Sequence, residues 1–254
     1  MRLRYEYTTQ VDFHPSVGRH NLLLRCLPAG EAFQRVCQEE FSISEGFRYK
    51  ETQDGFGNRI VSASVDCVHS KTISTASGVV EMTTYCIPDP VPHPMFSLTS
   101  RQTAVTREMV TLLPRRQAGT FLEDCMATVH AVHRHIVYTP GATNMLTTAE
   151  DVFRHRKGVC QDYAHLMIAL CRQAGIPARY VCGLMMGEGQ THAWVEAHDG
   201  QCWYAFDPTN DTAIATGYIK LAHGRDALDC PVSRGVYLGV AQQKTSINVI
   251  VKET

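Results

Sequence analysis

The hydrophobic period of the chain changes near its middle, and this change constrains the fold most. Up to residue 113, apolar and polar residues alternate over short runs, as in half-buried strands. After Pro114 apolar residues recur at helical spacing, and beyond Pro177 the strand pattern returns. Prolines at 88, 90, 92 and 94 interrupt any regular element before the change. We therefore predict a β-rich region over 1–113 and an α+β region over 114–254.

The first region is expected to form an antiparallel β-sandwich. Leu3, Tyr5 and Tyr7 alternate with charged residues, and D-G-F-G-N at 54–58 has the composition of a tight turn between strands. Several short strands at close intervals are typical of a sandwich. The further strand-like runs are 20–27, 33–43, 47–53, 58–66 and 79–87.

The second region is expected to place helices before an antiparallel meander. Thr120 with Glu123, and Thr148 with Asp151, are spaced as capping boxes at helix starts. A third helix begins near Val159 and ends at Gly175, with a proline beyond it as a stop signal. Strand patterns follow over 178–186, 191–198, 202–208 and 246–252.

The composition excludes several function classes. The 254 residues are 44% hydrophobic and 19% charged, with a net charge of −1, which is typical of a soluble globular protein and gives no reason to expect nucleic acid as a partner. No apolar run approaches the ~18 residues of a membrane span, and no signal peptide is visible. The ten cysteines form no C-x-x-C pair. We interpret them as reduced thiols of a cytoplasmic protein and leave the oligomeric state open.

Cys160 differs from the other cysteines because it lies at the entrance of the third helix. Unpaired N–H groups and the helix dipole favour an anion there, and Arg156 and Lys157 add positive charge just upstream. Cys171 lies three turns further along the same helix and has neither advantage. On cysteine content alone, a buried structural thiol is the commoner outcome.

A reactive cysteine needs a base, and His192 is the better candidate. His165 lies about 140° around the helix axis from Cys160 and points elsewhere. If Asp199 and Gly200 form a two-residue hairpin loop, His192 falls opposite Asp207, close enough for the carboxylate to orient the imidazole. A three-residue loop would shift this pairing, and an isolated His–Asp pair is more often a structural hydrogen bond.

Four blocks of the sequence resemble the core of the transglutaminase-like superfamily, in particular its bacterial branch of cysteine proteases. They are G-V-C-Q-D-Y-A-H-L (158–166), A-G-I-P-A-R-Y-V-C-G (174–183), T-H-A-W-V-E (191–196) and W-Y-A-F-D-P-T-N (203–210). G-R-D at 224–226 and the N-terminal β-region are also similar to that branch, although Ala227 stands where an aromatic residue is expected. The resemblance implies a papain-like fold, with the cysteine-bearing helix packed on an antiparallel sheet. It also implies a Cys-His-Asp triad of Cys160, His192 and Asp207.

The implied activity is thiol-dependent hydrolysis of an amide bond in a peptide or protein substrate, without a cofactor. Transfer of a glutamine acyl group to an amine is a second interpretation, and a non-catalytic binding module is a third. Tyr138 could donate to the oxyanion, although a buried packing role is commoner, and Trp194 could wall the substrate cleft or simply cover the core. We expect no metal site, because only two of the three histidines at 130, 133 and 135 share a helix face.

Overall fold

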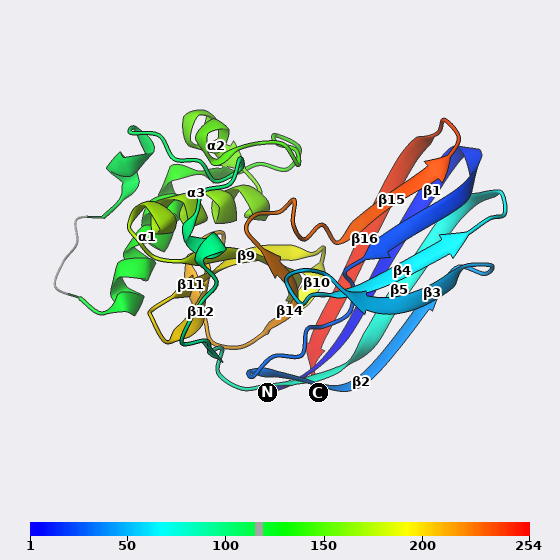
Figure 1. Ribbon diagram of the computed structural model, residues 1–254, viewed down its shortest axis with the longest axis horizontal. Coiled ribbons are helices and arrows are strands. Elements are labelled where there is room, and N and C mark those ends of the chain that lie inside the picture. Colours follow the sequence, from blue (N-terminus) through cyan, green and yellow to red (C-terminus); the bar gives the residue numbers. More distant parts are fainter. Residues whose placement is uncertain (115–118) are drawn as a thin grey trace.

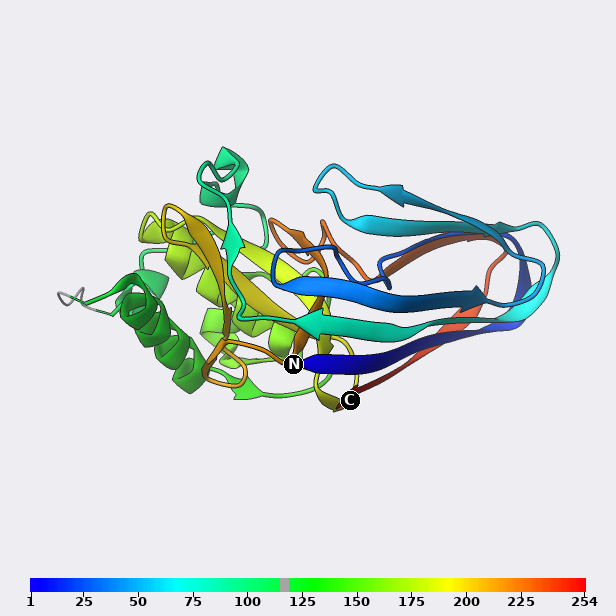
Figure 2. The same ribbon diagram turned by 90° about the horizontal axis from the view of Figure 1, so that it is seen from below.

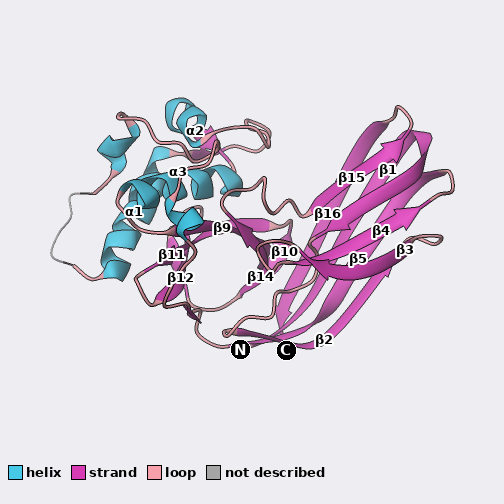
Figure 3. Cartoon of the chain, in the orientation of Figure 1, coloured by secondary structure: helices cyan, strands magenta, loops and turns pink. Residues whose placement is uncertain are grey.

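The computed structural model describes residues 1–114 and 119–254 and contains two large sheets, with the helices gathered beside one of them (Figures 1 and 3). An eight-stranded sheet extends to one side of the molecule, and a six-stranded sheet lies under the helices. The chain ends lie close together, since the Thr254 N–H donates to the Arg2 carbonyl at 3.0 Å (Figure 2). Among the described residues, none of the helices combines the length and apolar character needed to cross a membrane.

The eight-stranded sheet depends on one long strand. Strand β1 pairs through its first half with two neighbours, β5 and β16, and through its last residues with two others, β4 and β15. All these pairings are antiparallel, as predicted, whereas the two-layer packing of a sandwich stays a prediction. The strands are β1 (Arg2–Leu24), β2 (Gln34–Ile43), β3 (Arg48–Gln53), β4 (Arg59–Val65), β5 (His69–Met82), β10 (Gly187–Gly189), β15 (Ser233–Leu238) and β16 (Gln242–Glu253).

The six-stranded sheet follows the order β13-β12-β11-β9-β14, with β6 on β12. Helix α3 packs against β11 and β9, and α1 and α2 pack against α3, so α3 is buried between the sheet and the other helices. The strands are β6 (Ile87–Pro88), β9 (Ala178–Met185), β11 (His192–His198), β12 (Cys202–Asp207), β13 (Thr212–Ile214) and β14 (Tyr218–Gly224). The helices are α1 (Phe121–His135), α2 (Ala149–His155), α3 (Cys160–Gln173) and two 3₁₀ turns, η1 (Pro94–Ser97) and η2 (Met109–Leu112). A short parallel pair, β7 (Val137–Tyr138) and β8 (Lys157–Gly158), completes the fold.

The helix starts predicted from the sequence are confirmed. Thr120 with Glu123 caps α1, and Thr148 with Asp151 caps α2, in each case through reciprocal side-chain and backbone hydrogen bonds. Helix α3 ends just before Gly175, whose φ of 80° suits glycine at the end of a helix. Local capping chemistry therefore determines these boundaries.

Two features of the strand arrangement differ from the sequence prediction. Strand β5 begins ten residues before the predicted start at residue 79, because the polar run from His69 still alternates, with Thr72, Ser74 and Ala76 buried. The last strand, β16, pairs with β1 and with the short strand β10, and not with the strands of the six-stranded sheet. Residues 233–253 thus join the N-terminal sheet, while a boundary between folding units at residue 113, next to the four residues outside the described chain, stays a prediction.

The proline-rich stretch packs against the six-stranded sheet. Strand β6 pairs with β12, and the Asp89 N–H donates to the Gln201 carbonyl at 2.8 Å. The His198 ring and the Trp203 indole also hydrogen-bond Asp89, at 2.7 and 2.9 Å. This segment, which follows β5 in the chain, is therefore held on the six-stranded sheet.

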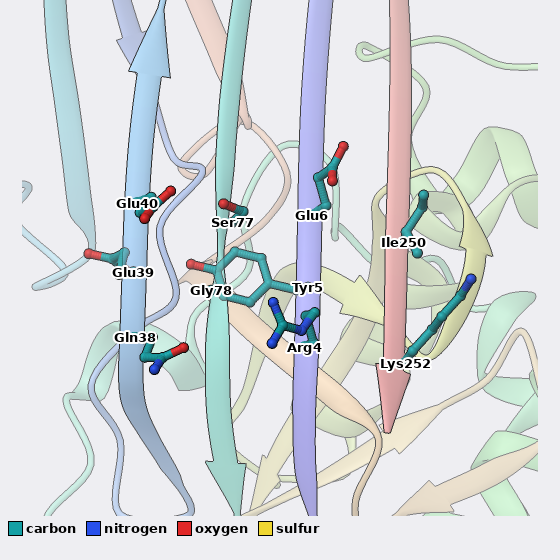
Figure 4. A pocket seen from close by; sticks show the side chains of 10 residues that line it. All are labelled: Arg4, Tyr5, Glu6, Gln38, Glu39, Glu40, Ser77, Gly78, Ile250 and Lys252. Carbon is teal, nitrogen blue, oxygen red and sulfur yellow. The ribbon is translucent and has the colours of Figure 1, made fainter. Parts of the chain in front are cut away.

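A shallow hollow of about 280 Å³ lies on the face of the eight-stranded sheet over β1, β2, β5 and β16 (Figure 4). Its floor includes Gly78, where a Cβ atom would meet the Gln38 carbonyl at 2.1 Å, so only glycine permits this close approach of β2. Its lining mixes acidic, basic and amide side chains and contains no cysteine or histidine. The candidate nucleophile lies elsewhere.

Candidate active site

The Cys160 thiol lies in the first turn of α3, where backbone N–H groups have no partner within the helix. Asp162 fixes this turn: its Oδ2 accepts from the Val159 N–H at 2.7 Å and from the Thr143 hydroxyl at 2.6 Å. Burial raises the pKa of the Asp162 carboxyl, and these two hydrogen bonds oppose that rise. A Cβ at Gly158 would lie 2.6 Å from the Asp162 Cβ, so the chain needs glycine to approach the helix start this closely.

His192 and Asp207 are brought together, but not through the predicted register. The pairs His198–Trp203 and Val195–Phe206 show that the hairpin turn centres on Gly200 and Gln201, one residue later than predicted. Gly200 is then the first central residue, and its φ of 104° is one that glycine adopts readily. Directly opposite Asp207 the register therefore places residue 194, and not residue 192.

The contact between His192 and Asp207 forms in the observed register as well, because side chains alternate along a strand. Moving the cross-strand partner by two residues keeps Asp207 on the same face of the sheet as His192, as a diagonal neighbour. The Nε2 atom of His192 lies 2.7 Å from Oδ2 of Asp207. Because Nε2 is engaged there, Nδ1 is the ring nitrogen left for the thiol.

Asp207 is fully buried and accepts hydrogen bonds from five donor groups. Oδ1 accepts from the backbone N–H groups of Thr209 and Asn210, and Oδ2 accepts from His192, the Asn210 side chain and the Tyr218 hydroxyl. Burial raises the pKa of this carboxyl, but the hydrogen bonds and the positive charge of His192 outweigh burial and hold it below the ordinary value. The side chain is therefore an anion aimed at the imidazole.

The same contacts determine the charge of His192. Burial lowers the pKa of the imidazole, but hydrogen bonds to Asp207 and to the Cys160 side chain outweigh burial and raise the pKa to about 10. The ring is thus an imidazolium at neutral pH. A cation next to the thiol favours the thiolate, which is the nucleophilic form of cysteine.

Cys160 and His192 open into one cavity of about 530 Å³. Tyr138 also lines it, at the end of the short β7–β8 pair, and is 52% exposed, so it is not the buried packing residue that the sequence favoured. The charge of Cys160 adds to partial burial in raising the pKa of the Tyr138 hydroxyl. The remaining lining residues are Pro140, Gly141, Val159, Met185, Met186, Gly187, Glu188, Gly189, Gln190 and Thr191.

Trp194 lies in the core and does not belong to the described lining of the cavity. Its indole N–H donates to the Tyr85 hydroxyl at 3.3 Å. Its ring packs so closely on Gly183 that a Cβ atom built there would lie 2.4 Å from the indole Cη2 atom. Trp194 therefore covers the core and does not wall the cavity. It points the same way as His192 from β11, but the Tyr218 ring covers it edge-on, with ring centroids 5.4 Å apart.

The four other histidines considered as a base or as metal ligands have structural partners. His165 is fully buried and accepts from the Ala227 N–H at 3.1 Å, facing away from the cavity as predicted. His130 pairs with Asp211, His133 with the Pro208 carbonyl and His135 with the Phe153 carbonyl. Within residues 1–114 and 119–254, no cluster of side chains could hold a metal ion.

Two residues of the site, Asn210 and Tyr218, are not predicted from the sequence. Asn210 belongs to the quoted D-P-T-N run, and an Asp followed by such a turn is a local signal that its carboxylate binds the next backbone N–H groups. Tyr218 carries no comparable signal, because it reaches Asp207 only through the pairing of β14 with β9.

Comparison with known proteins finds two family models that match the chain. Residues 113–208 match the model of the transglutaminase-like superfamily, and residues 3–81 match that of the bacterial transglutaminase-like N-terminal region. A "putative cysteine protease" from Cytophaga hutchinsonii superposes with a TM-score of 0.81 over all of this chain and 91% of that one, at 22% identity, which shows a shared fold.

Sequence relatives match over shorter segments. An uncharacterized protein of Mycobacterium leprae is 39% identical over 127 residues, which cover 46% of this chain and 44% of that protein. A protein-glutamine gamma-glutamyltransferase of Pseudomonas aeruginosa is 36% identical over 96 residues, covering 32% of this chain and 14% of that protein. The chain thus spans less than half the length of these curated relatives.

Replacing Asp207 by Asn tests the electrostatic coupling in the site. The amide keeps an acceptor beside His192 but removes the negative charge, so the pKa of His192 should fall from about 10 towards 6.5, by about one to three units. The wild-type ring stays protonated as pH rises through 6.5–10, whereas the variant's ring should lose its proton inside that window. NMR titration of the His192 ring protons measures both midpoints. Asp199→Asn, in the hairpin turn, is the control, and equal midpoints in wild type and Asp207→Asn would refute the coupling.

Proposed function

Since the chain belongs to the transglutaminase-like superfamily, we propose that it is a thiol-dependent amide hydrolase that uses Cys160, His192 and Asp207 as a papain-like triad. The observation that carries this proposal is the position of His192, which contacts a buried carboxylate on one side and the helix-entry thiol on the other. A purely structural His–Asp pair would not need a half-exposed thiol and an open cavity beside it.

The chemistry follows from the charges of these groups. The Cys160 thiolate attacks the carbon of a carboxamide, and a C–S bond forms as the carbonyl oxygen becomes an oxyanion. The His192 imidazolium, held by Asp207, gives its Nδ1 proton to the leaving amine as the C–N bond breaks. Neutral His192 then takes a proton from water, which attacks the thioester and releases the acid and the thiolate.

Two donors are available for the oxyanion. The backbone N–H of Cys160 opens the helix and is free of any intrahelical bond. Tyr138 lines the same cavity and is close enough to Cys160 for the thiol's charge to affect its hydroxyl. We assign the second hydrogen bond to this hydroxyl.

Transfer of the acyl group to an amine is the second candidate. The similarity to the Pseudomonas aeruginosa protein-glutamine gamma-glutamyltransferase favours it, although the matched segment is only 14% of that protein. The same thioester forms in both reactions, and the acceptor that reaches it decides the product.

A peptide library that contains glutamine, incubated with a labelled primary amine, separates the candidates. Products are read by mass spectrometry for wild type, for Cys160→Ala and for Cys171→Ala. Cys171 is the matched control because it lies on the same helix, where burial raises the pKa of its thiol to about 12. We expect cleaved peptides from wild type and Cys171→Ala and none from Cys160→Ala.

The other outcomes decide between the remaining functions. Cys160-dependent incorporation of the amine would make the protein an acyltransferase. Identical product spectra for wild type and Cys160→Ala would contradict both activities and favour a non-catalytic binding module.

The role of Tyr138 is tested by Tyr138→Phe, which removes only the hydroxyl. If this group stabilises the oxyanion, kcat should fall roughly 10²-fold with little change in KM, because the bond is made mainly in the transition state. Tyr49→Phe is the control, since Tyr49 is 49% exposed on β3 of the other sheet. An unchanged kcat in Tyr138→Phe would exclude the assignment.

A further inference from the structure

The short strand β10 forms one edge of the eight-stranded sheet and borders the cavity that holds Cys160. It pairs with β16 on one side, and in the described parts of the chain no strand pairs with its other side. All three of its residues are exposed. Figure 1 shows β10 where the two sheets meet, between β14 and β16.

An edge strand carries backbone groups that can bind a further strand. Along an extended chain, successive N–H and C=O groups point alternately to the two sides, so only half of those in β10 can bond β16. The groups that do not bond β16 point outward, and within residues 1–114 and 119–254 no strand pairs with them. Such an edge is the structure to which an extended peptide adds by backbone hydrogen bonding.

The side chains of β10 leave this edge accessible. Its sequence is Gly-Glu-Gly, and a Cβ built on Gly189 would meet no atom within 4 Å. The carboxylate of Glu188 is turned to the Lys252 ammonium at 3.0 Å, on the neighbouring strand β16. The backbone, and not a side chain, is therefore what β10 offers to a ligand.

The position of β10 connects this edge to the reactive groups. Gly187, Glu188 and Gly189 line the cavity together with Cys160, and the chain then runs directly through two more lining residues into His192. Gly189 and His192 are three residues apart, a span of at most about 10 Å in extended chain. Tyr138, Pro140 and Gly141 line the same cavity from a different segment. A peptide strand on β10 would therefore pass beside the thiol.

We propose that the substrate is an extended polypeptide segment that adds to the outer edge of β10 as a strand and presents its amide to Cys160; this inference rests on the proposed function. Recognition is then mainly through the backbone and tolerates many sequences, while amides of single amino acids are poor substrates. The N-terminal region has a direct role, because its sheet supports β10 through β16.

The test uses alanine-based peptidyl chloromethyl ketones, which need no natural substrate. The thiolate attacks the methylene carbon, a C–S bond forms and chloride leaves. The rate of Cys160 alkylation is compared for a pentapeptide probe, a single-residue probe and pentapeptides with one N-methylated amide at each position in turn. N-methylation removes one donor, which is worth roughly three- to tenfold per hydrogen bond.

We expect the pentapeptide probe to react at least about tenfold faster than the single-residue probe, as two or more backbone bonds imply. N-methylation should slow the reaction at every second position and have little effect between them, because strand pairing has a period of two. Equal rates for the long and short probes, or equal sensitivity at all positions, would overturn the proposal.

Hydrogen exchange of the labelled protein identifies the strand that binds the peptide. The pentapeptide adduct should slow amide exchange within residues 187–191, and the single-residue adduct, as the matched control, should not. Protection elsewhere with none at 187–191 would overturn the assignment to β10. If the probes label other cysteines as readily as Cys160, the proposed function fails as well, which distinguishes the two failures.

Discussion

The buried carboxylate of Asp207 is the group on which the rest of the site depends. An ion removed from water costs several kcal/mol unless hydrogen bonds and an opposite charge replace its hydration. Five donors from the turn after β12, from β14 and from β11 surround Asp207 and replace that hydration. The same arrangement fixes the orientation of His192 and leaves its other ring nitrogen for Cys160.

A second buried carboxylate fixes the other half of the site. Asp162 holds the first turn of α3 through Val159 and joins it to the preceding loop through Thr143. The thiol and the imidazole are thus placed by separate networks, one on the helix and one on the sheet, and α3 packs directly on β11 to bring them together. Each network also contains hydrogen bonds that do not involve the reactive groups.

The sequence predicts features that depend on residues close together in the chain, such as helix caps. It does not predict which distant strands pair. Capping boxes at Thr120 and Thr148 marked two helices, since those signals lie within four residues. The sequence predicts the hairpin turn one residue early, because both Asp199-Gly200 and Gly200-Gln201 satisfy turn rules. The contact between His192 and Asp207 forms nevertheless, because changing the cross-strand partner by two residues keeps both side chains on the same face. The positions of Tyr218, β10 and β16 depend on pairings between distant segments, and hydrophobic period does not encode which strands pair.

We propose that Cys160 is the nucleophile of the site and that the neighbouring His192 imidazolium activates it. The direct measurement is the rate of iodoacetamide alkylation of each cysteine at about pH 6, followed by peptide mass spectrometry, in wild type and in His192→Gln. An unperturbed thiol with a pKa of about 8.5 is less than about 1% ionised there. We expect Cys160 to react at least about tenfold faster than the exposed Cys67, and to lose this advantage in His192→Gln. Equal rates for Cys160 and Cys67 in wild type would contradict the claim.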